Sequence, residues 1–170
     1  MRAIGMFLFA SLVALLLRST VLASLATRGI VIDVLVLATV TWSLRQSDAW
    51  GATFGFVLGL AADLDASHWI GRHALALTLI GYGVGRLSNT LVRDSPLTQL
   101  VLIALATALH QIWVTAFDAT GGVQGLPWFA GRVLLATVTT APIGVLLLLL
   151  TRLLRRRGGY GHAPGTSTAG

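Results

Sequence analysis

The sequence contains no cysteine, which excludes disulfide bonds and metal sites with cysteine ligands. It also contains no lysine and no glutamate, so the net charge of +6 comes from 12 arginines and 6 aspartates. Only 11% of the 170 residues are charged, whereas a soluble domain has about a quarter. The hydrophobic residues, 55% of the total, lie in long runs along the whole length. We therefore expect an integral membrane protein whose arginines orient it in the bilayer, with no nucleic-acid partner.

Six apolar segments are candidate membrane-spanning helices, each of which needs about 20 residues to cross ~30 Å of hydrocarbon. They are Ile4 to about Ala23, Ile30–Leu44, Trp50–Leu64, His73–Val92, Leu97–Phe117 and Trp128–Leu150. The second and third are short, and the brief connections leave no room for a soluble domain. The predicted fold class is therefore all-α: one compact bundle of about six transmembrane helices over residues 1–157, followed by a disordered cytoplasmic tail over residues 158–170.

Arginine placement predicts the orientation of these spans. With six spans and both termini in the cytoplasm, eight arginines lie on the cytoplasmic side and four on the outer side, as the positive-inside rule requires. A cluster of four arginines between residues 152 and 157 dominates this count, so five spans with an external amino end are an alternative. A further alternative is that Met1–Leu17 is a cleaved signal peptide, although residues 17–20 do not form the small-residue site at which such peptides are cleaved.

Glycines recur at helical spacing in the third and fourth spans. They are Gly51, Gly55 and Gly59 in the third span, and Gly81, Gly83 and Gly85 in the fourth. Helices in lipid associate through close packing, which small residues permit. We predict that these positions pack against another helix. The partner is either the other of these two spans, joined by a short loop, or a helix of another protein or of a second copy of the chain.

A polar stripe follows the fourth span towards its cytoplasmic end. Its members lie within about 80° of one another on a helix of 3.6 residues per turn. They are Thr78, Tyr82, Arg86, Asn89 and Arg93. An arginine that faces lipid is costly at the bilayer centre, but Arg86 lies near the end of the span, where its side chain can reach the headgroups. The alternatives are such snorkelling, or a stripe that faces the bundle interior or a partner helix.

Two carboxylates at the outer ends of spans require donors. Asp63 follows the glycine series of the third span, and the nearest donor in sequence is Arg72 at the start of the fourth span. We predict a structural ion pair between them that holds the loop, with a ligand or ion site and a partner contact as alternatives. Asp33 and Arg28, at the outer start of the second span, are expected to join the same layer.

Signs of catalysis are weak. The sequence has no HExxH, GxSxG or phosphate-binding loop motif. Asp63, Asp65 and His68 are too few and too mixed to indicate a metal site. His110 and Gln111 form a polar pair inside the fifth span, which indicates either a functional site or a satisfied hydrogen bond between helices. We therefore expect that the protein is not an enzyme, and that it has no catalytic residue, no cofactor and no metal.

One stretch carries a recognisable pattern: Gly-Phe-x-x-Gly, a hydrophobic residue, x-x-Asp, a short loop to a glycine, and an apolar helix with a Gly-Tyr pair. The matching positions are Gly55, Phe56, Gly59, Asp63, Gly71, Gly81 and Tyr82. With this pattern, residues 55–87 resemble the rod shape-determining protein MreD family. Asp33 fits the Pro-Asp/Asn pair with which the family begins its second span, although Ile32 replaces the proline.

This resemblance implies a noncatalytic, multi-pass subunit of the bacterial cytoplasmic membrane. It would belong to the cell-elongation complex, scaffold lateral peptidoglycan synthesis and maintain cell shape. The implied partners are MreC, by direct contact, and through the complex the glycosyltransferase RodA, a penicillin-binding transpeptidase and cytoskeletal MreB. The family is also similar to the substrate-binding (S) components of energy-coupling-factor vitamin transporters, and such a component is the alternative function.

Overall fold

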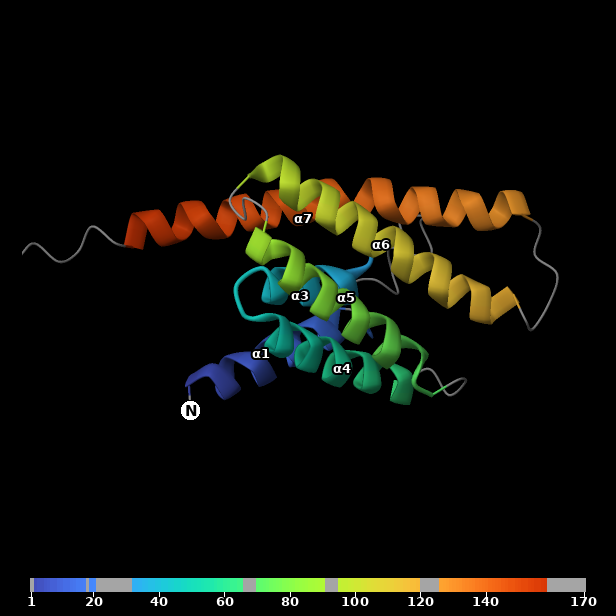
Figure 1. The fold of residues 1–170 in the computed structure, drawn as a ribbon, viewed down its shortest axis with the longest axis horizontal. Helices are drawn as coiled ribbons and strands as arrows, with labels where there is room; N and C mark the ends of the chain where they lie inside the picture. The colour runs from blue at the N-terminus through green and yellow to red at the C-terminus, as the bar shows by residue number, and fades with distance from the viewer. Residues whose placement is uncertain are drawn as a thin grey trace, which may run out of the picture.

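The computed structural model describes residues 2–17, 19–20, 32–65, 70–90, 95–119 and 126–158. This part of the chain contains six α-helices and no β-strand (Figure 1). The helices are α1 Arg2–Leu17, α3 Val34–Ser43, α4 Asp48–Asp65, α5 Arg72–Thr90, α6 Pro96–Ala119 and α7 Leu126–Gly158. Each lies within or overlaps one of the predicted apolar segments, so the all-helical fold class is confirmed.

Two of the described helices are long and apolar enough to cross a membrane. These stretches are Pro96–Phe117 of α6 and Phe129–Leu153 of α7. The apolar helix α3 is shorter, at 10 residues. The last helix continues to Gly158, one residue into the predicted tail, and residues 159–170 lie outside the described part of the chain.

The short helix α3 is the centre of the bundle. It contacts each of the other five described helices, and its Val36, Thr39, Val40 and Ser43 have no exposed surface. A helix that is apolar on all sides is suited to a buried position. The hydroxyl groups of Thr39 and Ser43 donate to the carbonyls of Leu35 and Thr39, each one turn earlier. These two hydroxyl groups are thus satisfied within the helix itself.

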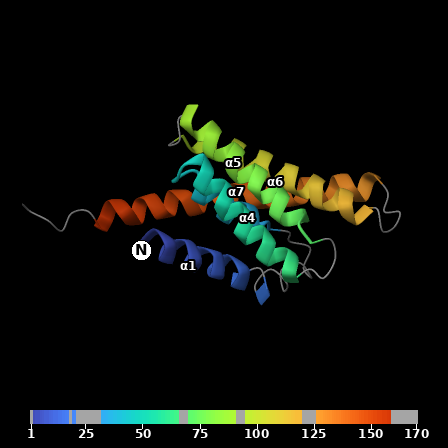
Figure 2. The same ribbon diagram turned by 60° about the horizontal axis from the view of Figure 1, so that its bottom comes forward.

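The other helices pack around α3 as two antiparallel pairs with α1 at one side. The pair α4 and α5 makes the most extensive contact, followed by α6 and α7. Seen from below, α4 lies between α1 and α5 (Figure 2). Three aromatic rings join α1, α3 and α4: Phe7 meets Trp42 and Phe54 edge to face, and Trp42 stacks on Phe54 with centroids 4.8 Å apart.

The helix directions bring the starts of α3, α5 and α7 to the same end of the bundle as the end of α4. We call this the Asp–His end, because Asp33, Asp63, His73 and His110 meet there. At the opposite end, the Arg45 side chain donates to the hydroxyl of Thr151 at 2.8 Å, which connects the end of α3 to α7.

Candidate functional site

The predicted packing glycines lie at the contact between α4 and α5. A Cβ atom added at Gly51 would lie 2.6 Å from the carbonyl oxygen of Gly81, and one added at Gly85 would lie 2.6 Å from Cα of Asp48. Side-chain carbons do not approach backbone atoms so closely, so only glycine permits this helix separation. The glycines of each helix therefore pack against the backbone of the other helix.

Gly55 and Gly59 lie at the middle of the same contact. A Cβ at Gly55 would collide with the carbonyl group of Leu77, and one at Gly59 with the backbone of Ala74. Both glycines are buried. These glycines therefore pack against the other span of the same chain and not against a helix of another protein or of a second copy. Since α4 and α5 cover this surface, no partner helix can bind there.

Asp63, in the last turn of α4, has no exposed surface and accepts four hydrogen bonds from the beginning of α5. Oδ1 accepts from Nδ1 and from the backbone N–H of His73, at 2.8 and 3.0 Å. Oδ2 accepts from the backbone N–H groups of Gly71 and Ala74, at 2.9 and 3.0 Å. Because the first N–H groups of a helix have no partner within it, Asp63 caps α5 from a different helix. The positive end of the helix dipole further favours a carboxylate there.

Sequence proximity predicts Arg72 as the partner of Asp63, but the side chain that makes the described contact is that of the next residue, His73. Gly71 has φ of 102°, a left-handed conformation that favours glycine, and it precedes the first turn of α5. The carbonyl of Arg72 accepts a hydrogen bond from Nε1 of Trp113 at 3.1 Å, which ties the start of α5 to α6.

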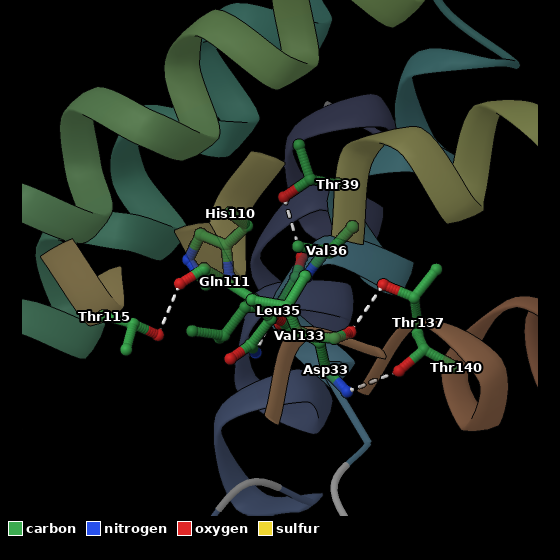
Figure 3. A network of polar contacts seen from close by, with 10 residues as sticks. All are labelled: Asp33, Leu35, Val36, Thr39, His110, Gln111, Thr115, Val133, Thr137 and Thr140. Carbon is green, nitrogen blue, oxygen red and sulfur yellow. Dashed lines mark hydrogen bonds and ion pairs between the residues drawn. The ribbon is translucent and has the colours of Figure 1, made fainter. Parts of the chain in front are cut away.

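Asp33 connects three helices (Figure 3). As the N-cap of α3, its Oδ1 accepts from the backbone N–H of Val36 at 3.2 Å. Its Oδ2 contacts Nδ1 of His110 and accepts from Nε2 of Gln111 at 2.9 Å, both on α6. Its backbone N–H donates to the hydroxyl of Thr140 on α7 at 3.0 Å. His110 and Gln111 therefore do make hydrogen bonds between segments, one of the two alternatives that the sequence leaves open.

The two Asp–His pairs adjoin each other. The rings of His73 and His110 lie with centroids 5.5 Å apart and planes at 55°. An ionised carboxylate only accepts hydrogen bonds, so Nδ1 carries the proton in each ring. The expected layer that contains Asp33 and Asp63 thus exists, joined through two histidines, while Arg28 lies outside the described residues.

A cavity of about 170 Å³ opens beside this layer. Its polar lining residues are Asp33, His73, His110, Gln111 and Arg132. Arg132 comes from the second turn of α7, so four helices or their caps contribute to the cavity. Its remaining walls are aliphatic side chains. The arrangement provides a carboxylate, a guanidinium and an imidazole around a space that is large enough for a small polar group.

A family model described as rod shape-determining protein MreD matches residues 1–154. The chain belongs to the MreD family. It is therefore a rod shape-determining membrane protein, and this family is not known for enzymatic activity. No curated protein and no solved structure matches the chain. The family match extends beyond residues 55–87, which carry the resemblance in the sequence, to all six described helices.

The polar stripe of this MreD-family chain faces outward on α5. Tyr82 is 43% exposed, Arg86 is also exposed, and Nη1 of Arg86 donates to the Tyr82 hydroxyl at 3.2 Å. The interior alternative is therefore wrong for these two residues. Thr78, half-buried, donates to the carbonyl of Ala74 in its own helix, and Arg93 lies outside the described residues.

An apolar groove of about 330 Å³ lies between α5 and α6 of the MreD-family fold. Its lining includes Leu79, Gly83 and Leu87 from α5 and Leu105, Leu109 and Trp113 from α6. A Cβ at Gly83 would meet nothing within 4 Å. The prediction of close packing is therefore wrong for Gly83, unlike the other five glycines of the two series. Gly83 leaves open space, and it lies three residues from Arg86 and four from Leu79 on one face of α5.

The contribution of α7 to this site has no signal in the sequence. Thr140 is one of several threonines in an apolar helix, and only the packing of α7 on α3 brings it to the N–H of Asp33. For His73 a signal exists, since it follows Arg72 directly at the start of a helix. Proximity to a carboxylate across the loop does not tell which of the two side chains turns inward.

We expect Thr140→Val to lower the free energy of unfolding by about 1–3 kcal/mol, because the buried N–H of Asp33 loses its acceptor. Thr137→Val is the matched control: its hydroxyl bonds only to the carbonyl of Val133 in the same helix among the described contacts. Denaturant unfolding of the two purified variants in detergent measures the difference. Equal effects in both would show that the Thr140 bond contributes little.

Proposed function

We propose that this chain is a noncatalytic subunit of the bacterial cell-elongation complex that scaffolds MreC and, through it, lateral peptidoglycan synthesis. The observation that supports this proposal is the match to the MreD family over residues 1–154. MreC is the direct partner in this proposal, and RodA, a penicillin-binding transpeptidase and MreB are reached through the complex. The role is structural, because the chain would position other proteins in the membrane.

The proposed topology has six spans with both termini in the cytoplasm. Its support is the distribution of arginines along the bundle: Arg45, Arg86 and Arg152 lie at the end opposite the Asp–His end, where α1 also begins and α7 also ends. Positive charge accumulates on the cytoplasmic side of membrane proteins. The Asp–His end would then face outward, with Arg72 and Arg132. The helix α3, too short to cross by itself, would be shielded from lipid by the five helices around it.

The groove between α5 and α6 is the proposed contact surface for an apolar helix of MreC. The glycine series cannot fill this role, since α4 and α5 already occupy it. The groove is apolar and contains the open position Gly83, and the Tyr82–Arg86 pair lies at its edge. A helix that covers this edge would also remove an arginine from contact with lipid, where it is costly. A second copy of the chain is the competing occupant.

Gly83→Trp is expected to reduce recovery of co-expressed MreC about tenfold or more, which corresponds to ~1.4 kcal/mol of binding free energy. The indole would fill the groove without disturbing the α4–α5 contact. Gly131→Trp on α7 is the matched control, since a Cβ there also meets nothing within 4 Å. Pull-down on tagged protein, with insertion and folding checked by size-exclusion chromatography, measures the effect.

Three results would contradict the proposal that this groove binds MreC. They are equal recovery of MreC with Gly83→Trp and with the parent, an equal loss of MreC recovery in both tryptophan variants, or a loss of self-association with no loss of MreC. The last result would assign the groove to a second copy of the chain. The likeness of fold to transporter S components stays a prediction, and no finding favours the vitamin-transporter alternative.

A further inference from the structure

The carboxyl end of α7 extends beyond the rest of the bundle (Figure 1), and the turned view in Figure 2 shows the same overhang. With 33 residues, α7 is about 50 Å long, whereas the hydrocarbon core of a bilayer is about 30 Å thick. The stretch that is apolar enough to cross ends at Leu153, and the helix continues to Gly158. The groove proposed for MreC is lined from α5 and α6, so an inference about the end of α7 is independent of that groove.

The end of the bundle at which α7 finishes carries an excess of positive charge. In the sequence, eight arginines belong to this end but only two aspartates, Asp48 and Asp94. The other four aspartates belong to the opposite end, across the bilayer. Even if each of the two aspartates neutralises one arginine, six arginine charges have no carboxylate side chain at this end to neutralise them. Whatever contacts these arginines make within the chain, most of their charge is therefore neutralised from outside it.

Four of these arginines form what we call the arginine collar of α7: Arg152, Arg155, Arg156 and Arg157. At 3.6 residues per turn, their positions are distributed over about 200° of the helix circumference and rise by only about 8 Å along its axis. The headgroup layer on one side of a bilayer has about this thickness. Because the collar begins where the apolar span ends, at Leu153, it lies at the depth of the lipid headgroups.

A fifth arginine is held beside the collar. Nη2 of Arg45, which follows the end of α3, donates to the hydroxyl of Thr151 at 2.8 Å. This hydroxyl in turn donates to the carbonyl of Leu148 in its own helix at 2.9 Å. Thr151 immediately precedes the collar in the sequence. The bond therefore fixes the guanidinium of Arg45 against the helix that carries the collar, and arginines of two segments come together there.

The surface of α7 next to the collar is apolar. Leu146, Leu150 and Leu153 are 68%, 51% and 59% exposed, and their spacing places them on one face of the helix. In a bilayer, acyl chains cover such a face, and a phospholipid whose chains lie along it has its phosphate at the depth of the collar. Arginine can bind phosphate oxygens with two parallel hydrogen bonds. Lipid phosphates are thus suitable anions that the bilayer itself supplies at this depth.

We propose that the arginine collar and Arg45 bind the phosphate groups of anionic phospholipids, with the acyl chains along the exposed leucines of α7. A zwitterionic headgroup brings its own cation and leaves the excess charge uncompensated, whereas each anionic headgroup neutralises part of it. Arginine clusters directly at the cytoplasmic end of a membrane-spanning helix favour such lipids. An acidic segment of a cytoplasmic protein is the competing occupant, but it would have to enter the headgroup layer to reach the collar.

The class of ligand is tested by thermal unfolding of the unmodified protein in detergent with four added probes. Phosphatidylglycerol has a net negative charge, phosphatidylcholine with the same acyl chains has no net charge, glycerol 3-phosphate lacks the chains, and polyglutamate represents an acidic protein segment. A ligand that binds only the native state raises the unfolding temperature in a saturable way. We expect such a rise with phosphatidylglycerol and not with phosphatidylcholine or glycerol 3-phosphate. No rise with phosphatidylglycerol, or an equal rise with any other probe, overturns the proposal.

The site is tested with a triple variant, Arg155→Gln with Arg156→Gln and Arg157→Gln. Each arginine near an anionic surface contributes about fivefold to binding, so we expect the half-saturating concentration of phosphatidylglycerol to rise about tenfold or more. The corresponding triple lysine variant is the matched control, because it keeps the charges at the same positions, and it should bind within about twofold of the parent. Equal binding by the parent and the glutamine variant overturns the proposal, and so does a lysine variant as weak as the glutamine variant.

Retained lipid gives a second readout that does not depend on stability. The protein is reconstituted in equal amounts of phosphatidylglycerol and phosphatidylcholine and extracted into detergent, and the lipids that stay bound are measured by mass spectrometry. We expect phosphatidylglycerol to be enriched about twofold or more with the parent, less with Arg45→Gln, and not with the triple glutamine variant. Equal proportions of the two lipids with the parent overturn the proposal. Recovery of MreC with the glutamine variant should stay that of the parent, because the groove is unchanged.

Discussion

Replacement of Gly55 by alanine is expected to prevent the native contact between α4 and α5, although it adds a single methyl group. The added Cβ would collide with the carbonyl group of Leu77, which is part of a helix backbone and cannot rotate away. Overpacking costs about 1–3 kcal/mol where side chains can adjust, and we expect a loss at or above the top of this range. Denaturant unfolding of the purified protein in detergent, followed by helical circular dichroism, measures it.

Gly83→Ala is the matched control for this prediction. It lies on α5, has open space around its Cα, and should gain up to about 1 kcal/mol, because alanine favours a helix more than glycine does. The opposite sign of the two substitutions separates a steric effect from a propensity effect. A Gly55→Ala variant as stable as the parent would show that the two helices can move apart without a loss of stability. The close packing of α4 and α5 would then contribute little to the free energy of unfolding.

Asp63→Asn is the second substitution for which we expect a large effect, a loss of about 3–5 kcal/mol in the free energy of unfolding, because two buried donors at the start of α5 lose their acceptor at about 1–3 kcal/mol each. The carboxylate accepts four hydrogen bonds, two on each oxygen. An asparagine has one acceptor oxygen, and its amide would place N–H donors against N–H donors. The charge and the second acceptor are thus both required, and the substitution should also disturb rod shape in cells.

Asp48→Asn provides the control for the loss of a negative charge. Asp48 begins α4 at the opposite end of the bundle, and its carboxylate accepts from the N–H of Ala49 at 2.9 Å. Since asparagine caps helices as well as aspartate does, we expect a change within about 1 kcal/mol. The same denaturant titration compares the two variants. Equal stability of the Asp63 and Asp48 variants would show that the α5 cap does not depend on a carboxylate.

The use of glycine explains how α4 and α5 form a stable unit in lipid. Apolar burial adds little when the solvent is itself apolar, so helices there depend on close contact and on internal hydrogen bonds. The α4–α5 pair has both, since glycines allow the backbones to approach and Asp63 joins the helix ends. The docking of partners therefore has to use other surfaces, which is why we propose the groove that contains Gly83.

The sequence alone determined the class of this protein and the places of its helices. Low charge and long apolar runs indicate a membrane protein, because a water-exposed surface cannot be built from such a composition. The glycine spacing in α4 and α5 correctly predicted close helix packing, and residues 55–87 correctly predicted the MreD family. Each of these features depends on residues that are close together in the sequence, so it can be predicted from periodicity and from short motifs.

The tertiary structure decided which polar groups meet. Asp33 and His110 are 77 residues apart, and no pattern in the sequence pairs them. His73 rather than Arg72 contacts Asp63, because the turn at Gly71 and the first turn of α5 set which side chain faces the end of α4. The cavity beside them exists only where α3, α5, α6 and α7 meet. Contacts of this kind depend on the crossing of helices far apart in the chain, and helix positions by themselves do not specify that crossing.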